Sequence, residues 1–231
     1  MKIEILHLIE GAKQAQGLTV IIDVFRAFSL ECFLYGMGIK EIRPVETIED
    51  AFLLRNQIKD AVLIGERNGA KCEGFDFGNS PSTISVQEVK GKTIIHTTSA
   101  GTQGIINAKN ADEIITGSLV NAKAVATYIQ RRRPGKVSLV CMGTGGVEKN
   151  IEDELCANYI DSILRGECLP ELEEKIKDLR YRGGEHFFVA ENQWVFPQED
   201  FWMCTKHDVF PFVIQVVKDE LGFVTKKIVI E

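Results

Sequence analysis

The feature that most constrains the fold is a regular alternation of short apolar runs with segments of helical periodicity. The apolar runs predict strands at residues 2–7, 18–22, 40–45, 61–65, 93–96, 112–116 and 136–141. The segments between and after them predict helices at residues 28–37, 47–59, 102–109, 119–132, 150–165 and 170–180. Such an alternation is typical of an α/β protein with a mainly parallel sheet covered by helices.

The C-terminal tail breaks this alternation. In VIQVVKDELGFVTKKIVIE, residues 213–231, two β-rich runs flank Asp219-Glu220-Leu221-Gly222, which predicts an antiparallel hairpin and therefore a mixed sheet. With 231 residues, 45% of them hydrophobic, the chain can bury one sizeable core. We interpret residues 1–231 as a single α/β domain.

Charge and cysteine usage exclude several classes of protein. A formal charge of -6, with no basic run beyond Arg131-Arg132-Arg133, does not suggest a nucleic-acid partner. The six cysteines are scattered without a CxxC pair, which indicates reduced thiols in a cytoplasmic protein. The N-terminus MKIEILHLIEG lacks a secretory apolar region, and no apolar run approaches the roughly 18 residues of a membrane span, so no membrane partner is expected.

Polar residues gather directly after the predicted strands. Ligands of open α/β sheets bind outside the carboxyl ends of the strands, so these positions are the candidates for a site. They comprise carboxylates, cations, hydroxyls and glycines, namely Asp23, Arg26, Ser29, Glu66, Arg67, Thr97, Thr98, Ser99, Gly101, Thr102, Gly143, Thr144, Gly145 and Gly146.

Each candidate also has a structural interpretation when it is considered alone. Asp23, for example, could cap the helix that follows it. As a set, converging carboxylates suit Mg²⁺, which prefers oxygen ligands and keeps waters that a phosphate can displace. Arg26 and Arg67 supply forked donors for a phosphate or sulfonate, and the TTSAGT stretch at residues 97–102 supplies hydroxyls and amides at a helix N-terminus.

A further group of carboxylates, Glu152-Asp153-Glu154, lies at the start of a predicted helix with Asn150 as its expected N-cap. Negative charge is favoured there by the helix dipole alone. The spacing could also turn one acid toward the strand ends, and it does not choose among the three.

Other known catalytic and ligand-binding motifs do not match this sequence. The glycine loop after residue 142 has Glu148 where a P-loop needs glycine, which also spoils a dinucleotide fingerprint. Cys141 precedes that loop as a phosphatase nucleophile would, but Val147 replaces the required arginine, and we interpret Cys141 as a buried core thiol. The four histidines lack zinc-ligand spacing.

Seven stretches together resemble one enzyme family: DVFRAFS, GER, GFDFGNSP, TTSAGT, CMGTGG, EDELCA and EDFWMCTKHD. In this order and at these separations, from about residue 18 to about residue 215, the chain resembles the Mg²⁺-dependent 2-phosphosulfolactate phosphatases. The resemblance implies a three-layer α/β/α fold. It also implies hydrolysis of 2-phosphosulfolactate to sulfolactate and phosphate, on the route to coenzyme M.

The matching positions in this chain give the expected site. They are Asp23, Arg26, Glu66, Arg67, Asp76, Asn79, Ser80, Thr98, Ser99, Gly101, Thr102, Glu152 and Asp153. Where relatives often read TTNGT, this chain has Ala100 in place of the amide residue, and NSPSTI lacks an acidic residue expected soon after the proline. Both differences are expected to affect the substrate more than the reaction.

From these residues we expect Mg²⁺ to be held by Asp23, Glu66 and either Asp153 or Glu152. Catalytic roles are expected for Asp23, Arg26, Glu66 and Asp153. The anionic small-molecule substrate is expected to contact Arg26, Arg67, Asp76, Asn79, Ser80, Thr98, Ser99, Gly101, Thr102 and Gly143.

Three further expectations concern the loop, the oligomer and the function class. The glycine-containing loop at residues 65–81 is expected to fold over the site as a partial lid, and a homo-oligomer is expected on general grounds. The alternative function is a non-catalytic module that binds a phosphorylated or sulfonated metabolite. Such a module would keep the arginines and glycine loops without needing converging carboxylates.

Overall fold

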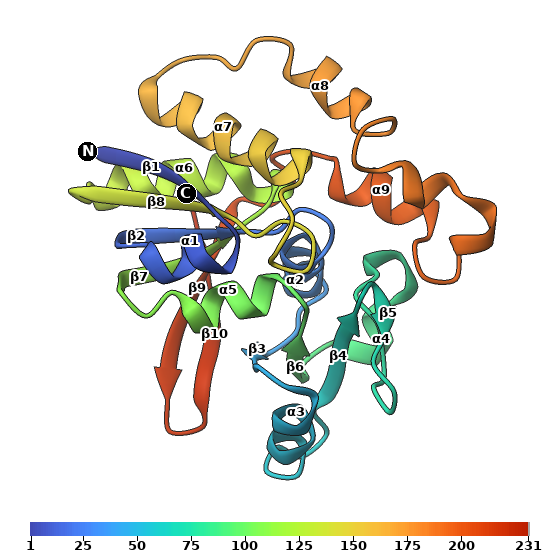
Figure 1. Ribbon diagram of the computed structural model, residues 1–231. Coiled ribbons are helices and arrows are strands. Elements are labelled where there is room, and N and C mark those ends of the chain that lie inside the picture. The colour runs from blue at the N-terminus through green and yellow to red at the C-terminus, as the bar shows by residue number, and fades with distance from the viewer. Residues whose placement is uncertain (231) are drawn as a thin grey trace.

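The computed structural model describes residues 1–230, and its strands form two sheets (Figure 1). The larger sheet has the spatial order β1 (Lys2–His7), β8 (Lys136–Cys141), β2 (Gly17–Ile22), β7 (Ala111–Gly117), β9 (Phe212–Asp219) and β10 (Gly222–Val229). The smaller has the order β3 (Glu41–Pro44), β6 (Thr93–Thr97), β4 (Val62–Arg67) and β5 (Ala70–Lys71). Each strand predicted from the apolar runs is present.

Strand direction confirms a mixed, mainly parallel fold. In the larger sheet β1, β8, β2 and β7 are parallel, whereas β9 and β10 form the expected antiparallel hairpin at the C-terminus. In the smaller sheet β3, β6 and β4 are parallel and β5 is antiparallel. The division into two sheets was not predicted, because periodicity identifies strands but not their partners.

Helices alternate with the strands as the sequence predicts. Their bounds are α1 (Leu8–Gln14), α2 (Ala27–Gly36), α3 (Ile48–Arg55), α4 (Val86–Val89), α5 (Gly101–Asn107), α6 (Ala122–Arg132), α7 (Ile151–Arg165), α8 (Leu172–Asp178) and α9 (Gln198–Cys204). Short 3-10 helices cover Pro81–Thr83, Leu119–Asn121, Glu185–Phe188 and Ala190–Asn192. Within residues 1–230, none of the helices has the length and apolar character required to cross a bilayer.

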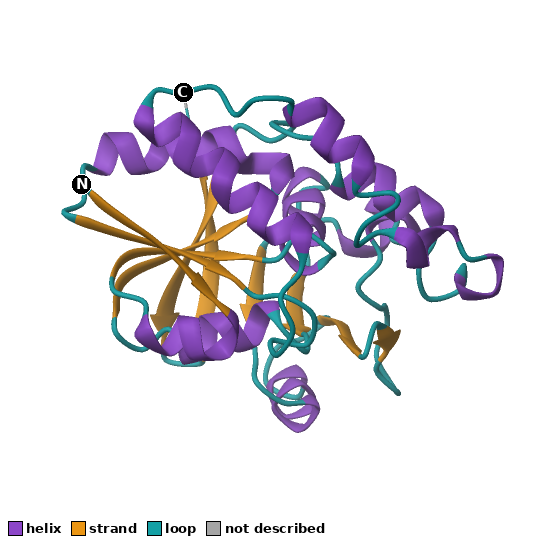
Figure 2. Ribbon diagram, turned by 45° about the horizontal axis from the view of Figure 1, so that its top comes forward, coloured by secondary structure: helices purple, strands orange, loops and turns teal. Residues whose placement is uncertain are grey.

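The larger sheet is the middle of three layers, which confirms the expected α/β/α arrangement (Figures 1 and 2). On β2, Val20 and Ile22 are buried in the apolar cluster that contains residues of α6 and α7. Ile21 faces the other way, into a cluster with Ala12 of α1 and Ile105 of α5. This alternation along a strand that is buried on both faces explains its continuous apolar run.

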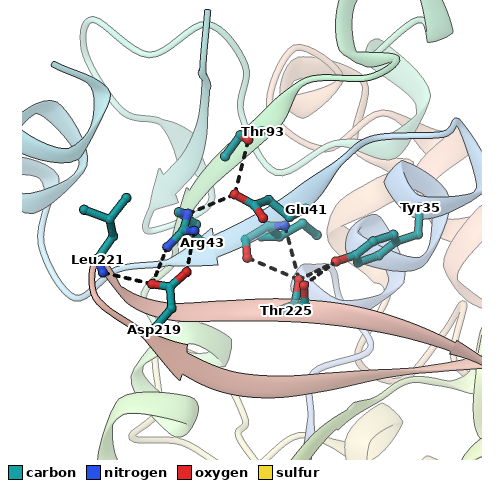
Figure 3. A network of polar contacts seen from close by, with 8 residues as sticks. Tyr35, Glu41, Arg43, Thr93, Asp219, Leu221 and Thr225 are labelled. Carbon is teal, nitrogen blue, oxygen red and sulfur yellow. Dashed lines mark hydrogen bonds and ion pairs between the residues drawn. The ribbon is translucent and has the colours of Figure 1, made fainter. Parts of the chain in front are cut away.

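A polar joint connects the two sheets where β10 lies against β3 (Figure 3). The buried Thr225 hydroxyl on β10 accepts a hydrogen bond from the amide of Ile42 at 3.2 Å and donates to the carbonyl of Ile42 at 3.2 Å. Beside it, Arg43 donates to both carboxylate oxygens of Asp219, at 2.9 and 2.7 Å. Side chains therefore make the connection that a strand ladder would otherwise make.

The segment from α8 to α9, residues 172–204, extends beyond the larger sheet on the side of the β4–β5 hairpin (Figure 1). An aromatic cluster attaches it to the core: Phe25 contacts Phe187 and Phe201, with ring centroids 5.0 and 5.7 Å apart. Phe187 and Phe201 are almost fully buried. The segment thus has its own apolar anchor next to the start of α2.

The loop at residues 65–81 is ordered against the smaller sheet. Phe75 is buried, Phe77 is half-buried, and the amides of Asp76 and Phe77 donate to the carbonyl of Leu63 at 3.0 and 3.1 Å. Both ends of the loop reach the strand-end candidates described below, because the carbonyl of Gly69 accepts from Arg26 and the hydroxyl of Ser80 donates to Asp200, the partner of Arg26. The partial lid and the single-domain interpretation of residues 1–231 stay predictions.

Candidate active site

Asp23 lies directly after β2 and is buried. Its Oδ1 accepts a hydrogen bond from the amide of Ala27, the first residue of α2, at 3.1 Å. Asp23 therefore accepts a hydrogen bond from the first amide of α2, as the capping interpretation expects. At its other side, α5 begins so close that a β-carbon on Gly101 would lie 2.9 Å from Oδ2 of Asp23. The carboxylate thus sits between the N-termini of two helices.

Asp153, in the first turn of α7, joins the ends of two strands. Its Oδ1 accepts from the amide of Val24 at 2.8 Å, and its Oδ2 accepts from the amide of Gly143 at 2.9 Å. Gly143 has φ +66°, and a β-carbon there would lie 2.1 Å from the carbonyl oxygen of Glu148, so only glycine fits. The loop after β8 is shaped to present this amide to Asp153.

The structure also distinguishes the three acids at the start of α7. Glu152 and Asp153 are buried, whereas the side chain of Glu154 is 42% exposed and lies 3.6 Å from His7. Asn150 caps the helix as expected, accepting from the amide of Asp153 at 3.3 Å. Two acids therefore face the strand ends and one faces outward.

Glu152 carries a buried oxygen without a partner. Its Oε2 accepts no hydrogen bond from the described residues, and a β-carbon on Gly183 would lie 2.9 Å from it. Burial, followed by the charges of Asp153 and Asp23, raises the pKa of Glu152 to about 9. An unsatisfied buried carboxylate oxygen is costly unless a ligand pairs with it.

Repulsion among these carboxylates is visible in their pKa values. Burial and then the charge of Asp153 raise the pKa of Asp23 well above its ordinary value, against the opposing amides of Ala27 and Gly101. Burial also raises the pKa of Asp153 to about 6 although the amides of Val24 and Gly143 favour its charged form. Like charges held close in a buried place are what a bound cation would relieve.

Glu66, at the end of β4, connects two loops beside this cluster. Its Oε1 accepts from the amide of Ser99 at 2.6 Å, and its Oε2 accepts from the amide of Gly69 at 2.7 Å. The hydroxyl of Ser99 donates to the same Oε2 at 3.2 Å. The charge of Glu66 contributes to the raised pKa of Asp23, so Glu66 belongs to the same electrostatic group.

The residues after β6 form the wall next to Asp23. The amide of Thr98 donates to the hydroxyl of Thr102 at 2.8 Å, and the amide of Thr102 donates to that of Thr98 at 3.1 Å. These reciprocal bonds hold the turn that precedes α5. Ala100 is buried in an apolar cluster with Phe28, so the residue that departs from the expected motif contacts the core.

The four candidates from the loop at residues 67–80, which are Arg67, Asp76, Asn79 and Ser80, have different partners. Arg67 donates to the carbonyl of Glu66 at 2.7 Å and to the hydroxyl of Thr97 at 2.9 Å, near the cluster. Asp76 accepts from the amide of Leu63 at 2.8 Å, toward the opposite end of β4, so the structure does not group it with the others.

Asn79 is the third of these candidates, and it belongs to a buried polar chain. Its Oδ1 lies 3.1 Å from Nε2 of His96, whose Nδ1 lies 2.9 Å from Glu31. All three side chains are buried. The sequence analysis did not identify Glu31 or His96 as partners, because no local spacing connects α2 with β6.

Arg26 is buried in contacts that the sequence did not predict. Its Nη1 donates to Oδ2 of Asp200 at 2.8 Å and to the carbonyl of Val195 at 2.7 Å, and its Nη2 donates to the carbonyl of Gly69 at 3.2 Å. Ser80 donates to the other oxygen of Asp200 at 2.9 Å. Asp200 lies in the EDFWMCTKHD stretch, whose pattern alone predicts no role for it.

A metal site is not already assembled from protein ligands alone. Within the described part of the chain, no three or more His, Cys, Asp or Glu side chains are grouped so that they could hold a metal ion. The carboxylates nevertheless offer hard oxygen donors, and Mg²⁺ is usually held by one or two carboxylates together with waters and a phosphate. The donor set therefore fits a hydrated divalent cation.

Comparison with known proteins agrees with this geometry. Residues 3–182 match the family described as 2-phosphosulpholactate phosphatase. A probable 2-phosphosulfolactate phosphatase of Carboxydothermus hydrogenoformans is 40% identical over 177 residues, which are 76% of this chain and 72% of that protein. A probable 2-phosphosulfolactate phosphatase of Clostridium acetobutylicum is 33% identical over 239 residues, which cover 96% of this chain and 100% of that protein.

A third relative extends the comparison to a further genus. The probable 2-phosphosulfolactate phosphatase of Bacillus subtilis is 30% identical over 204 residues, 87% of this chain and 88% of that protein. The matched residues include the strand ends that carry Asp23 and Glu66 and the start of α7. The chain belongs to the 2-phosphosulfolactate phosphatase family.

Proposed function

We propose that this protein hydrolyses the phosphate monoester of 2-phosphosulfolactate, giving sulfolactate and phosphate. Family membership supports the substrate, because the curated relatives carry this activity in their names. The observation that carries the chemistry is the gathering of buried, mutually repelling carboxylates, Asp23, Glu152 and Asp153, at the strand ends. The alternative, a binding module without catalysis, has no use for such a cluster.

We further propose that the enzyme uses Mg²⁺, for which one or two of the carboxylates of Asp23, Glu152 and Asp153 would be ligands, together with waters and the phosphate. The unpartnered Oε2 of Glu152 and the raised pKa of Asp23 support this assignment. When bound, Mg²⁺ offsets negative charge on the phosphoryl group and on the leaving alkoxide. Glu66, whose oxygens are taken by the amides of Gly69 and Ser99, would shape the loops beside the cation.

The chain's own donors would bind the anionic groups of the substrate. Arg26 uses three of its five N–H donors in the contacts with Asp200, Val195 and Gly69, which leaves two within the described chain for an anion. The hydroxyls of Ser80 and Ser99 already donate to Asp200 and Glu66, so the amides at the N-terminus of α5 are the neutral donors left nearby. A phosphate dianion beside a carboxylate and a sulfonate needs several such donors.

The test is phosphate release by the purified protein after metal chelation, with and without added Mg²⁺. We expect release from 2-phosphosulfolactate only when Mg²⁺ is present, and slower release from phosphate monoesters that lack the sulfonate. No release from any ester, together with tight binding of 2-phosphosulfolactate, would favour the binding module instead.

The setting of the enzyme is also part of the proposal. We propose a cytoplasmic homo-oligomer that acts on the route to coenzyme M. All six cysteines are free thiols, which supports a reducing compartment. A search for coenzyme M or sulfolactate in extracts of the source organism would test the pathway, and light scattering of the purified protein would test the oligomer.

A further inference from the structure

Asp200 is a buried carboxylate that no sequence motif assigned to the site. It lies in α9 with an exposed fraction of 0%, and it accepts three hydrogen bonds from two other parts of the chain. Oδ2 accepts from Arg26, at the start of α2. Oδ1 accepts from the hydroxyl of Ser80 at 2.9 Å and from the amide of Ser82 at 3.0 Å.

The guanidinium of Arg26 is held by the segment between α8 and α9 and by the turn between β4 and β5. Its carbon lies 4.8 Å from the ring centroid of Phe196 and 5.8 Å from that of Phe187, both in the segment between α8 and α9. The carbonyl of Gly69 accepts from its Nη2, while the amide of Gly69 donates to Glu66. The ion pair is therefore continuous with the carboxylate cluster through a single residue.

A buried arginine needs a counter-charge, and the identity of that group fixes the plane of the guanidinium. Asp200 supplies the charge and at the same time restrains Ser80, a second candidate for substrate contact. Asp200 thus sets the direction of a cationic donor, while Ser80 uses its one hydroxyl proton to hold Asp200. Donors that are fixed in advance bind an anion with a smaller ordering cost.

We propose that Asp200 is a positioning residue, which orients Arg26 toward the phosphorylated substrate without contacting it, and that the hydrogen bond from Ser80 holds Asp200 in place. This inference rests on the proposed function, because it assumes that the remaining donors of Arg26 meet the anionic groups of the ester. Asp200 also connects α9 to the start of α2, so the segment between α8 and α9 is fastened over the strand ends by the same ion pair that orients the donors.

The experiment compares Asp200→Asn with Asp219→Asn. The control removes the carboxylate of a second arginine–aspartate pair, at the joint between the sheets, where Arg43 is its partner. For both variants kcat, KM, the inhibition constant of inorganic phosphate and the thermal midpoint are measured with Mg²⁺ present. We expect Asp200→Asn to lose about 10²-fold in kcat/KM, mostly through KM, and to bind phosphate correspondingly more weakly. Asp219→Asn is expected to lower only the thermal midpoint.

Ser80→Ala covers the case in which Asp200→Asn does not fold, because it removes only one hydroxyl bond to the same carboxylate. We expect a rise in KM and in the phosphate inhibition constant with a nearly unchanged thermal midpoint. Wild-type KM and phosphate affinity in whichever variants fold would overturn the positioning role and leave Asp200 a purely structural residue.

Calorimetric titration with inorganic phosphate separates this inference from the proposed function. If the wild type releases no phosphate from any ester but binds phosphate more tightly than Asp200→Asn, the proposed function is wrong and the positioning role stands. If the wild type neither hydrolyses an ester nor binds phosphate, both are wrong.

Discussion

The joint between the sheets and the edge that carries Asp23 contain the same kinds of residue in opposite electrostatic states. At the joint, hydrogen bonds from Arg43 and from the amide of Leu221 lower the pKa of Asp219 to about 2 (Figure 3). At the strand ends, burial and like charges raise the pKa of Glu152 to about 9. At the joint a cation favours the charged form of the carboxylate, whereas at the strand ends burial and neighbouring carboxylates favour the protonated form.

This contrast separates structural carboxylates from functional ones. A carboxylate that is paired with a cation contributes to folding, whereas buried carboxylates gathered without a cation destabilise the fold and persist where a ligand needs them. Arg26 and Asp200 stand between the two cases, because they form a fully buried pair within the functional region. Substitutions that disrupt the contacts of one region should leave the other region unaffected.

The largest effect is expected from Asp23→Asn. Asp23 would act either as a nucleophile that attacks phosphorus or as a ligand that positions the metal and water. Both roles require its carboxylate, so kcat should fall about 10³-fold or more. Phosphate release is measured with Mg²⁺ saturating. Glu154→Gln, which removes the outward-facing acid of the neighbouring turn, is the control and should keep nearly full activity. Near wild-type turnover by Asp23→Asn would rule out both roles.

Arg43→Met should act on stability alone. The substitution leaves Glu41 and Asp219 without their cation, and we expect a loss of about 2 kcal/mol, less than for a fully enclosed pair because the side chain of Asp219 is partly exposed. Urea unfolding measures the loss, and kcat/KM should not change. Arg165→Met, at a solvent-exposed ion pair, is the control. A drop in kcat/KM beyond the loss of folded protein would show that the regions are not independent.

Thr225→Val tests the polar connection between β10 and β3. Removal of the hydroxyl leaves the buried amide and carbonyl of Ile42 without their partner, which should cost about 1–2 kcal/mol. Thr225→Ser keeps the hydroxyl and should lose much less. A larger loss for the serine variant than for the valine variant, which keeps the methyl group, would mean that methyl packing, not hydrogen bonding, holds the sheets together.

The smallest effect is a pH dependence at the joint. Because the pKa of Asp219 is lower in the folded chain than its ordinary value of 3.8, its contribution to stability is complete above about pH 4 and is lost as the pH falls through about 2. The difference in unfolding free energy between wild type and Asp219→Asn should therefore shrink over that interval. A constant difference would contradict the assigned ion pair.

The sequence predicted the strands and most helices because apolar periodicity is a local property. Every predicted strand is present, and the hairpin at the C-terminus follows from the turn signal at Gly222. The pairing of strands is not local, so the division into two sheets escaped prediction. The joint depends on the hydroxyl of Thr225 and on the pair of Arg43 with Asp219, and no local pattern reveals either contact.

The candidate site divides in the same way. Asp23, Glu66 and Asp153 follow strands or open a helix, and strand topology brings such positions together. Asp200 could not be found by this reasoning, since it lies in a late helix separated from Arg26 by 174 positions. Asp76 was included on resemblance, and the structure places its carboxylate on the amide of Leu63 instead.

The central claim is that the buried carboxylates at the strand ends form a cation site. Calorimetric titration of Mg²⁺ into chelator-treated wild type and Asp23→Asn tests this most directly, since it does not depend on the substrate. The account predicts saturable binding to the wild type and a large loss of affinity in Asp23→Asn. Equal binding by both proteins, or no saturable binding to the wild type, would contradict it.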